Sequence, residues 1–340
     1  MMVLGIDTSC DDTAMALVED GRIIHSNVIS SQTDLLQKYG GVYPEMACRR
    51  HIEMCEPVLQ EALGNFSIAQ IDLIAAARGP GLIGALLIGL NFAKALALSS
   101  KKPFVGVNHI EAHLYSAMMD KPPPLPALGV VISGGHTSLV IIKDVGDYEL
   151  IGQTQDDAIG EAFDKVARLL NLGFPGGPAV EQLAKIGDPS AYPFRGGIVK
   201  GRPFDLSFSG LKTAVLYATQ KQSYVDADIA ASFQRAAFES LIEKILLASQ
   251  KYQLRSIVLG GGVSASQTLR EMMQARLDLP LFWPQRELCL DNGAMIAGLG
   301  YHNYSRKGAD PLDLNATARI PFDAPFSSPS PSSMCELHTS

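Results

Sequence analysis

The hydrophobic pattern opens with three short strand-like runs separated by polar turns. Residues 3–7 are apolar, 8–12 are polar, 13–18 are apolar again, and 22–29 alternate after a turn at 19–21. Short apolar or alternating runs bounded by turn residues predict β-strands. The N-terminal segment is therefore predicted to form three strands joined by short turns.

The same pattern returns over residues 128–154. The two copies align without gaps at an offset of 124, which places Gly5 on Gly129, Thr13 on Thr137 and Asp20 on Asp144. Internal repeats report on architecture before any other signal does. The chain is therefore predicted to be α/β and to contain one unit twice.

Helices are predicted after each set of strands. Apolar residues recur at helical spacing over 44–64, 157–172 and 227–253. A short strand at 255–259 runs into glycines, a helix follows from Ser266, and another helix covers 292–304, opened by Asp291. The apolar stretch 81–98 resembles a membrane span, but it holds Gly84, Gly89 and Lys94 between glycine and proline turns. We predict a buried helix packed through its glycines there.

Proline-rich segments mark the domain boundaries. Residues 122–126 read Pro-Pro-Pro-Leu-Pro, a stiff connector. We expect one lobe from 1–124 plus 292–320 and a second from 125–291. Residues 321–340 hold four prolines and six serines and are expected to be a disordered tail.

Composition restricts the class of protein. Of 340 residues, 47% are hydrophobic and 19% are charged, which is enough for a packed core. The net charge of −7 disfavours a general nucleic-acid coat, although it permits local basic patches such as 49–51, 101–102 and 200–202. Five scattered cysteines without a Cys-x-x-Cys pair and the lack of a leader-like start favour a cytoplasmic protein with no membrane segment.

Three turns of small or polar residues follow predicted strands. They are Asp7–Asp12, Ser133–Thr137 and Gly260–Ser264. Glycine at a strand end lets backbone N–H groups approach an anion without an intervening side chain. Each turn alone is more often just a turn, but in a repeated context the set favours phosphate or nucleotide binding.

Two histidines in the segment 108–113 have the spacing of metal ligands. His109 and His113 are four residues apart, so on a helix they share one face. Glu111 points elsewhere, and the zinc-protease position after the first histidine is Ile110, so a metalloprotease lacks its general base. A third ligand is needed, for which Asp291 is a candidate. Two histidines and one carboxylate suit Fe(II) or Zn(II), although such a pair is often structural.

Two further polar segments carry an ambiguous signal. Residues 205–213 form a dense polar and aromatic loop that could serve a ligand or cap a helix. Residues 174–178 form a rigid turn into a helix that carries Glu181. That carboxylate could face a ribose or lie in solvent in the first turn.

A set of motifs, taken in order along residues 2–320, resembles the TsaD family of tRNA threonylcarbamoyladenosine transferases. The motifs are Gly5–Thr13, Tyr39–Glu45, Gly79–Leu82, His109–His113, Ser133–Thr137, Glu161–Lys165, Pro175–Pro178, Ser207–Thr213, Gly261–Ser264 and Asp291–Met295. The resemblance implies a duplicated actin/sugar-kinase/Hsp70-like (ASKHA) fold of two lobes with mixed five-stranded sheets. This fold agrees with the repeat.

The resemblance also implies an activity. The family transfers a threonylcarbamoyl group from threonylcarbamoyl-AMP to the exocyclic amine of adenosine 37 in tRNAs that read codons beginning with adenine. It implies a TsaB-like paralogue and a TsaE-like ATPase as partners, with a TsaC-like enzyme that supplies the adenylate.

The resemblance assigns residues by motif. It implies one divalent metal, Fe(II) before Zn(II) or Mg(II), held by His109, His113 and Asp291. It assigns substrate contacts to the residues Val131, Ile132, Ser133, Gly134, Gly135, Asp164, Gly177 and Glu181. Ser266 departs from the asparagine common in bacterial relatives and has no amide donor, which puts that contact in question.

The chemistry of the transfer restricts the roles that residues can take. AMP is a good leaving group, so no covalent enzyme intermediate is required. A metal would serve as a Lewis acid, glycine turns would stabilise the departing phosphate, and Asp11 would orient or deprotonate the amine unless it is only a turn carboxylate. The alternatives are an ATP-dependent kinase or ATPase of the same fold, a metalloprotease, and a non-catalytic scaffold.

Overall fold

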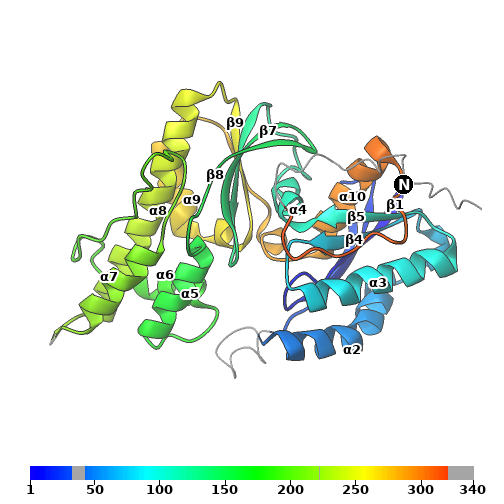
Figure 1. Ribbon diagram of the computed structural model, residues 1–340, viewed down its shortest axis with the longest axis horizontal. Helices are drawn as coiled ribbons and strands as arrows, with labels where there is room; N and C mark the ends of the chain where they lie inside the picture. Colours follow the sequence, from blue (N-terminus) through cyan, green and yellow to red (C-terminus); the bar gives the residue numbers. More distant parts are fainter. Residues whose placement is uncertain (33–42, 222, 321–340) are drawn as a thin grey trace, which may run out of the picture.

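The computed structural model describes residues 1–32, 43–221 and 223–320. The expected tail at 321–340 lies outside the described residues. The described chain contains two five-stranded sheets, with helices between them and on their outer faces (Figure 1).

The first sheet is built from the N-terminal strands. Its order is β3-β2-β1-β4-β5, with β1 antiparallel to β2 and parallel to β4. The strands are β1 (Met2–Asp7), β2 (Thr13–Glu19), β3 (Ile23–Ser30), β4 (Leu73–Gly79) and β5 (Phe104–Asn108).

The second sheet repeats this topology, with the order β10-β9-β6-β7-β8. Its strands are β6 (Ala127–Ile132), β7 (Thr137–Asp144), β8 (Asp147–Gln153), β9 (Ser256–Gly260) and β10 (Leu281–Phe282). The pairing registers also agree: Gly5 faces Ala16 in one sheet and Gly129 faces Val140 in the other, both shifted by 124 residues. The duplicated fold predicted from the sequence is confirmed.

Nine α-helices lie in the described chain. They are α2 (Pro44–Leu63), α3 (Ile83–Ser100), α4 (His109–Ser116), α5 (Ile159–Leu169), α6 (Gly176–Ala184), α7 (Ser209–Thr219), α8 (Asp226–Lys251), α9 (Gln267–Arg276) and α10 (Gly293–Lys307). In Figure 1, α2 and α3 cover one side of the first sheet, α4 and α10 lie toward the second sheet, and α5 to α9 cover the far side of the second sheet.

Strand alternation explains this layering. Leu4 and Ile6 of β1 join the core formed with α2 and α3, while Val3 joins the core formed with α4 and α10. In β6, Val130 faces the outer helices and Val131 faces the α4 side. Both sheets are thus covered on both faces, and the α4–α10 layer is common to them.

Two glycines let these inner helices approach the strands closely. A Cβ on Gly5 of β1 would lie 2.2 Å from the carbonyl oxygen of Gly293 in α10. A Cβ on Gly260 of β9 would lie 2.3 Å from the carbonyl oxygen of His113 in α4. These contacts fix the start of α10 and the histidine helix against the carboxyl ends of strands from both sheets.

Two local predictions need correction. The helix near residue 292 is capped by Asn292, whose side chain accepts from the N–H of Met295, and Asp291 is left outside the helix and free for another role. Helix α3 is buried on only one face. Its Gly89 packs against Thr8 as expected, but Leu98 is 68% exposed.

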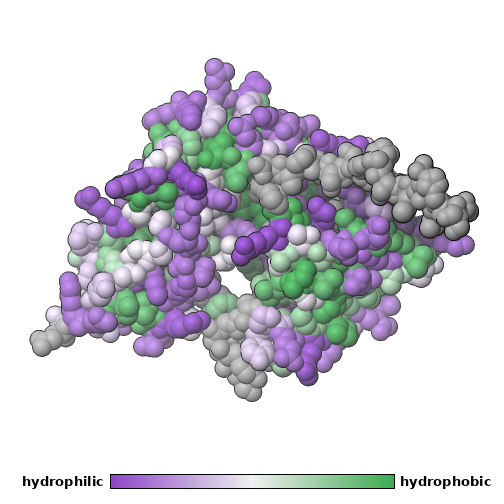
Figure 2. Space-filling model, in the orientation of Figure 1, coloured by the Kyte–Doolittle hydropathy of each residue, from purple (hydrophilic) through white to green (hydrophobic). Residues whose placement is uncertain are grey.

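Helix α3 is also the helix, within the described residues, that is long and apolar enough to cross a membrane by length and composition. Ala85, Leu86 and Leu90 are nevertheless buried against the protein, and apolar side chains remain visible on the surface over α3 (Figure 2). One such helix is common in the core of proteins that never enter a bilayer.

Candidate functional site

The two histidines lie at the start of α4, directly after β5. Asn108 ends the strand and caps the helix, because its side-chain oxygen accepts from the N–H groups of Ile110 and Glu111. His109 and His113 are one turn apart, and their ring centroids are 4.6 Å apart. Both are buried, at 7% and 1% exposure. The expected shared helical face is confirmed.

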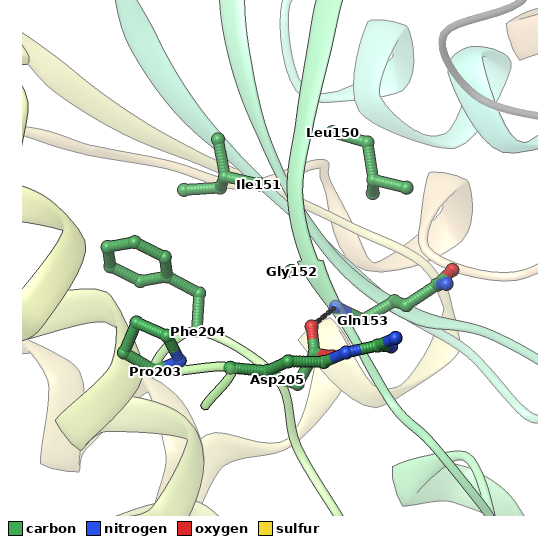
Figure 3. A pocket seen from close by; sticks show the side chains of 8 residues that line it. Leu150, Ile151, Gly152, Gln153, Pro203, Phe204 and Asp205 are labelled. Carbon is green, nitrogen blue, oxygen red and sulfur yellow. Dashed lines mark hydrogen bonds and ion pairs between the residues drawn. The ribbon is translucent and has the colours of Figure 1, made fainter. Parts of the chain in front are cut away.

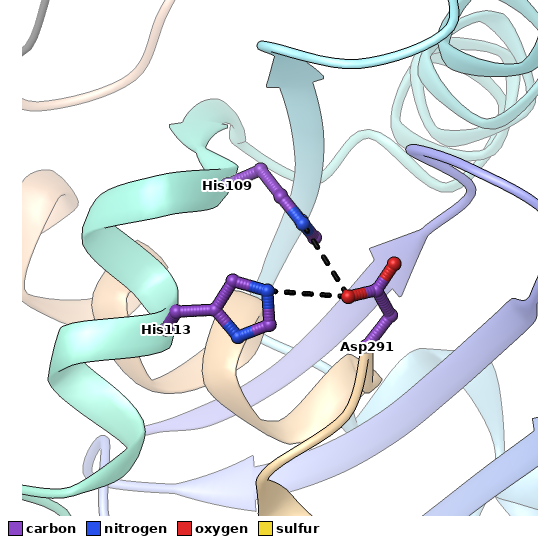
Figure 4. A group of neighbouring side chains, drawn as sticks. All are labelled: His109, His113 and Asp291. Atoms are coloured by element: carbon purple, nitrogen blue, oxygen red, sulfur yellow. Dashed lines mark ion pairs between the residues drawn. The ribbon is translucent and has the colours of Figure 1, made fainter. Parts of the chain in front are cut away.

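The third residue comes from the other end of the chain. Asp291 precedes the Asn292 cap of α10, and its Oδ1 lies 3.2 Å from Nε2 of His113 and 3.5 Å from Nε2 of His109 (Figure 4). The ligand atoms of the three residues all lie within 4.8 Å of one another. The structure therefore brings His109, His113 and Asp291 together as one group that can hold a metal ion.

The electrostatics of this group are those of a tightly coupled cluster. Burial lowers the pKa of His109, but the carboxylates of Asp7 and Asp291 outweigh it and raise that pKa to about 10. Burial alone would raise the pKa of Asp291, yet the two histidines hold it well below its usual range. The site thus favours a positive charge beside the carboxylates. In the metal-free chain this charge is on His109, and a bound metal ion would supply it instead.

The donor set fits a divalent metal. Nε2 of His113 is buried and has no hydrogen-bond partner within the described residues, although it points at Asp291. A buried imidazole nitrogen without a hydrogen bond is costly unless it binds something. Two imidazoles and one carboxylate match the ligand preferences of Fe(II) or Zn(II).

The turn after β1 borders this group. Ser9 Oγ lies 3.4 Å from Nε2 of His109 and 3.5 Å from Oδ2 of Asp291. Burial raises the pKa of Asp11, and the charge of Asp291 raises it further. Burial and the charge of Asp11 raise the pKa of Asp12 to about 7. The predicted residue Asp11 therefore lies near the metal-ligand group, in a turn where carboxylates resist ionisation.

The glycine turn after β6 is open. A Cβ built on Gly134 or Gly135 would meet no heavy atom within 4 Å. The turn is held in shape by two bonds between Ser133 and His136: the N–H of Ser133 donates to the carbonyl of His136, and the N–H of His136 donates to Ser133 Oγ. Val131 and Ile132, two of the predicted substrate residues, are fully buried in β6, so the exposed part of this turn begins after them.

Close backbone contacts join this turn to the metal-ligand helix. Gly260 lies against the carbonyl of His113, and the next residue, Gly261, lies against the carbonyl of Ile132. Burial, and to a lesser extent the charges of His109 and His113, lower the pKa of His136 to about 4. The glycine turn and the histidine pair are therefore neighbours.

The other predicted substrate residues form two pairs in the second half of the molecule. Asp164 Oδ1 accepts from the N–H of Gly176, beside the open backbone of Gly177. Glu181 Oε1 accepts from Ser266 Oγ and from the N–H of Thr268, both at 2.9 Å. Ser266 also caps α9 by accepting from Leu269. Ser266 thus has a defined structural partner in Glu181.

Glu111 and the polar loop at 205–213 lie outside this arrangement. Burial raises the pKa of Glu111 to about 7, while the positive charges of Arg78, Lys307 and Arg306 lower it, and the group of potential metal ligands does not include this carboxylate. The loop runs into α7, and Asp156 caps it by accepting from the N–H groups of Phe208 and Ser209. Of the two roles considered for this loop, capping a helix is the one that agrees with these contacts.

A pocket of about 270 Å³ lies on the edge strand β8, lined by Leu150–Gln153 and Arg202–Asp205 (Figure 3). Asp205 accepts there from the N–H of Gln153. None of the predicted site residues lines this pocket.

Three residues near the site were given no role of their own from the sequence, although Asp7 and Ser9 lie in a turn predicted to bind phosphate. Asp7 lies 3.2 Å from Nδ1 of His109, Ser9 reaches both His109 and Asp291, and His51 bonds Thr13 and the carbonyl of Cys10 at either end of the Asp11 turn. The i, i+4 histidine spacing is visible in the sequence, whereas these contacts join residues far apart in the chain.

The duplicated sheets and the site between their strand ends define the ASKHA class. The fold resembles full-length HypF in a phosphate- and nucleotide-bound form, with a TM-score of 0.60 and 15% identity over 90% of this chain and 46% of that one. It also resembles component A of (R)-2-hydroxyglutaryl-CoA dehydratase from Acidaminococcus fermentans, with a TM-score of 0.54 and 14% identity over 90% and 99% of the two chains. These likenesses establish the fold.

The TsaD family model, described as tRNA N6-adenosine threonylcarbamoyltransferase, matches residues 23–298, and the chain belongs to this family. A relative of that name from Protochlamydia amoebophila is 54% identical over 95% of this chain and 99% of its own length. One from Symbiobacterium thermophilum is 49% identical over 93% and 95%. The family resemblance found in the sequence is confirmed.

Proposed function

We propose that this chain transfers a threonylcarbamoyl group to N6 of an adenosine in tRNA. The observation that carries the proposal is the full-length match to tRNA N6-adenosine threonylcarbamoyltransferases, in a chain whose His109, His113 and Asp291 converge from distant segments. In finer detail, the donor is threonylcarbamoyl-AMP and the acceptor is adenosine 37 in tRNAs that read codons beginning with adenine.

The glycine turn is the proposed site of the donor. Gly134, Gly135 and Gly177 have open space where a side chain would be, so the phosphate and the nucleoside can lie against the backbone. Asp164, Glu181 and Ser266 complete this side of the site through their contacts between α5, α6 and α9. Backbone N–H groups directed at the phosphate stabilise AMP as it leaves.

The acid turn is the proposed site of the acceptor amine. An exocyclic adenine amine is a weak nucleophile and must be oriented toward the carbonyl that it attacks. Asp11 lies in this turn near Asp291, and burial raises the pKa of its carboxyl, which makes the ionised carboxylate a stronger base. The ionised carboxylate accepts a hydrogen bond from the amine. As the nitrogen bonds to the carbonyl carbon, the bond from that carbon to the phosphate oxygen breaks, AMP leaves with that electron pair, and Asp11 takes the proton that the amine loses.

A divalent metal, Fe(II) before Zn(II) or Mg(II), is proposed at His109, His113 and Asp291, where it would supply a Lewis acid. Ser9 positions Asp291 from the neighbouring turn. The low exposure of both histidines excludes bulk water from this end of the site.

The remaining proposals concern partners and organisation. We propose a cytoplasmic enzyme that works with a TsaB-like paralogue and a TsaE-like ATPase. We also propose a lobe of residues 1–124 plus 292–320 and a lobe of residues 125–291. The packing of α10 on the strands of the first sheet supports the first of these lobes.

Family membership decides between the alternatives. A kinase or ATPase shares the fold but gives the histidine pair no role. A metalloprotease needs a glutamate next to the first histidine, and Glu111 neither has that position nor belongs to the group of potential metal ligands.

The test is a transfer assay with preformed threonylcarbamoyl-AMP and tRNA transcripts. We expect product with adenosine at position 37 and none with inosine there, because inosine lacks the exocyclic amine. Equal product with inosine would contradict N6 transfer. ATP hydrolysis by the isolated chain without any transfer would favour the kinase or ATPase alternative.

A further inference from the structure

Asp7 is the buried carboxylate behind one histidine of the metal-ligand group. It is the last residue of β1, and its exposure is 0%. Its Oδ1 accepts from the N–H of Ser9 at 3.0 Å, and its Oδ2 lies 3.2 Å from Nδ1 of His109. Oδ2 and this Nδ1 are in contact at ion-pair distance but are not aligned as a hydrogen bond, and neither atom has a hydrogen-bond partner among the described residues. The two groups therefore face each other in a site that water does not reach.

This contact determines which nitrogen of His109 can bind a metal. A carboxylate only accepts hydrogen bonds, so it places the imidazole N–H on Nδ1. The lone pair is then on Nε2, the atom that faces Asp291 at 3.5 Å. Carboxylates behind metal-bound histidines orient the ring and raise its basicity in this way.

The two histidines differ in this respect. Nδ1 of His109 has the carboxylate of Asp7 at 3.2 Å, whereas Nδ1 of His113 is buried with neither a hydrogen-bond partner nor an ion-pair contact within the described part of the chain. His109 is therefore held from behind by Asp7, whereas His113 depends on its helix and on packing. The same carboxylate accepts a hydrogen bond from the N–H of Ser9, and the hydroxyl of Ser9 contacts Asp291. Asp7 therefore contacts His109 directly and is linked to Asp291 through Ser9.

We propose that Asp7 is a positioning residue of the metal centre, which acts by holding Nδ1–H of His109 and so presenting Nε2 to the ion. This inference rests on the proposed metal site. The end of β1 thereby becomes part of the metal centre. Asp7 acts through His109 and is not a catalytic residue.

The test compares Asp7→Asn with Asp205→Asn by chelator competition with Zn(II). Asparagine at 7 can still accept from Ser9, but its amide turns a donor toward Nδ1, which favours the wrong tautomer. We expect Zn(II) affinity to fall by about 10- to 100-fold. Asp205 is a matched control, because it is also buried and also accepts from a backbone N–H, that of Gln153, but lies outside the cluster. Its variant should bind Zn(II) like wild type.

A second measurement uses the wild-type chain, and a third combines Asp7→Asn with the loss of one histidine. In the Zn(II)-loaded wild-type chain, ¹⁵N shifts of His109 should show metal on Nε2 and a proton on Nδ1. In a His109→Ala chain, Asp7→Asn should have no further effect on affinity, while in a His113→Ala chain it should still weaken binding.

Three results would overturn the inference. Unchanged affinity in a folded Asp7→Asn chain, or metal on Nδ1 of His109, would overturn it and leave the metal site intact. Failure of the wild-type chain to bind Zn(II) would overturn the metal site itself, and the inference with it.

Discussion

The turns after β1 and β6 occupy the same place in the duplicated fold but have opposite chemistry. The register offset of 124 residues places Asp7 on Val131, and Cys10 and Asp11 on Gly134 and Gly135. The first turn is acidic and largely buried, with Thr8 and Ser9 at 1% and 2% exposure. The second carries two exposed glycines with open space above them.

In the proposed function, this difference lets one scaffold hold two substrates. The open glycine turn would leave backbone N–H groups available to the donor phosphate, while the turn after β1 places Asp7 beside His109 and would direct Asp11 to the amine. Both turns lie at strand carboxyl ends, where open α/β sheets bind ligands. The two turns thus differ in a few side chains, while the strand pairing around them is the same.

The largest expected effect comes from removing one of the metal-binding side chains that α4 and the start of α10 bring together. His109→Ala and Asp291→Ala should each lower metal content and transfer activity by about 100-fold or more, because a three-ligand site with open positions tolerates little loss. Elemental analysis beside the transfer assay measures both.

Glu111→Gln is the matched control, since this acid lies on α4 between the two histidines but is not in the group of potential metal ligands. It should keep its metal. If Asp291→Ala retains full metal and transfer, the third ligand is another residue. If His109→Ala also retains both, the histidine pair is structural.

Adding a methyl group at the open glycines should weaken donor binding and leave the other properties of the chain unchanged. Gly134→Ala and Gly177→Ala add a methyl group where the protein has no atoms, so folding should be unaffected. A bound donor would meet that methyl group, and overpacking of this kind costs about 1–3 kcal/mol, or about 5- to 150-fold in the KM for threonylcarbamoyl-AMP. Gly210→Ala, equally open but on α7, is the control. A normal donor KM in both Gly134→Ala and Gly177→Ala would place the donor elsewhere.

The turn after β1 should also show a pH dependence near neutral pH, through Asp12. The pKa of Asp12 is raised to about 7 in the folded chain, so folding favours its protonated form. Its contribution to stability is therefore full at low pH and is lost as pH rises through about 7. In metal-free protein, Asp12→Asn should unfold at a higher temperature than wild type at pH 8, and the gap should shrink at pH 5. A gap that is the same at both pH values would show that Asp12 ionises normally.

Binding of tRNA should depend on unpaired basic residues. Arg49 and Arg50 are paired with Glu45 and Glu53 on α2, whereas exposed Lys200 has no ion pair within the described residues. Lys200→Ala should weaken tRNA binding several-fold and reduce its salt slope by about 1, while Arg49→Ala should change little. With a net charge of −7, the isolated chain should bind tRNA weakly at raised salt. Tight binding that ignores salt would contradict this account.

The smallest effect is expected at Ser266. Ser266→Ala removes the cap of α9 and the bond to Glu181, which should lower the free energy of unfolding by about 1 kcal/mol. Ser266→Asn keeps a capping oxygen and adds an amide donor, so donor affinity should stay the same or rise. Calorimetric titration with the adenylate measures this. A large loss with asparagine would mean that the pocket is built around the smaller side chain.

The fold was predictable because its signals are local. The repeat lies in the hydrophobic pattern itself, and the observed registers reproduce its offset of 124 residues. The spacing of His109 and His113 likewise predicts their shared face. The start of α10 was predicted less well, because two adjacent residues, Asp291 and Asn292, are both good helix caps. Asn292 caps the helix, which leaves Asp291 for the metal-ligand group.

The surroundings of the site were not predictable, because they depend on contacts between distant segments. Asp7 looks like any acid at a strand end, and only the folded chain places it against His109, 102 residues away. His51 looks like part of a basic cluster with Arg49 and Arg50, yet it is buried and bonds Thr13. Such pairings follow from tertiary packing and leave no periodic signal in a single sequence.

The central claim is that this chain modifies tRNA at adenosine N6. Its most direct test is nucleoside analysis by mass spectrometry of tRNA from cells depleted of the protein. The account predicts that N6-threonylcarbamoyladenosine disappears and that the wild-type gene restores it, whereas the Asp291→Ala gene does not. Unchanged levels of that nucleoside after depletion would contradict the account.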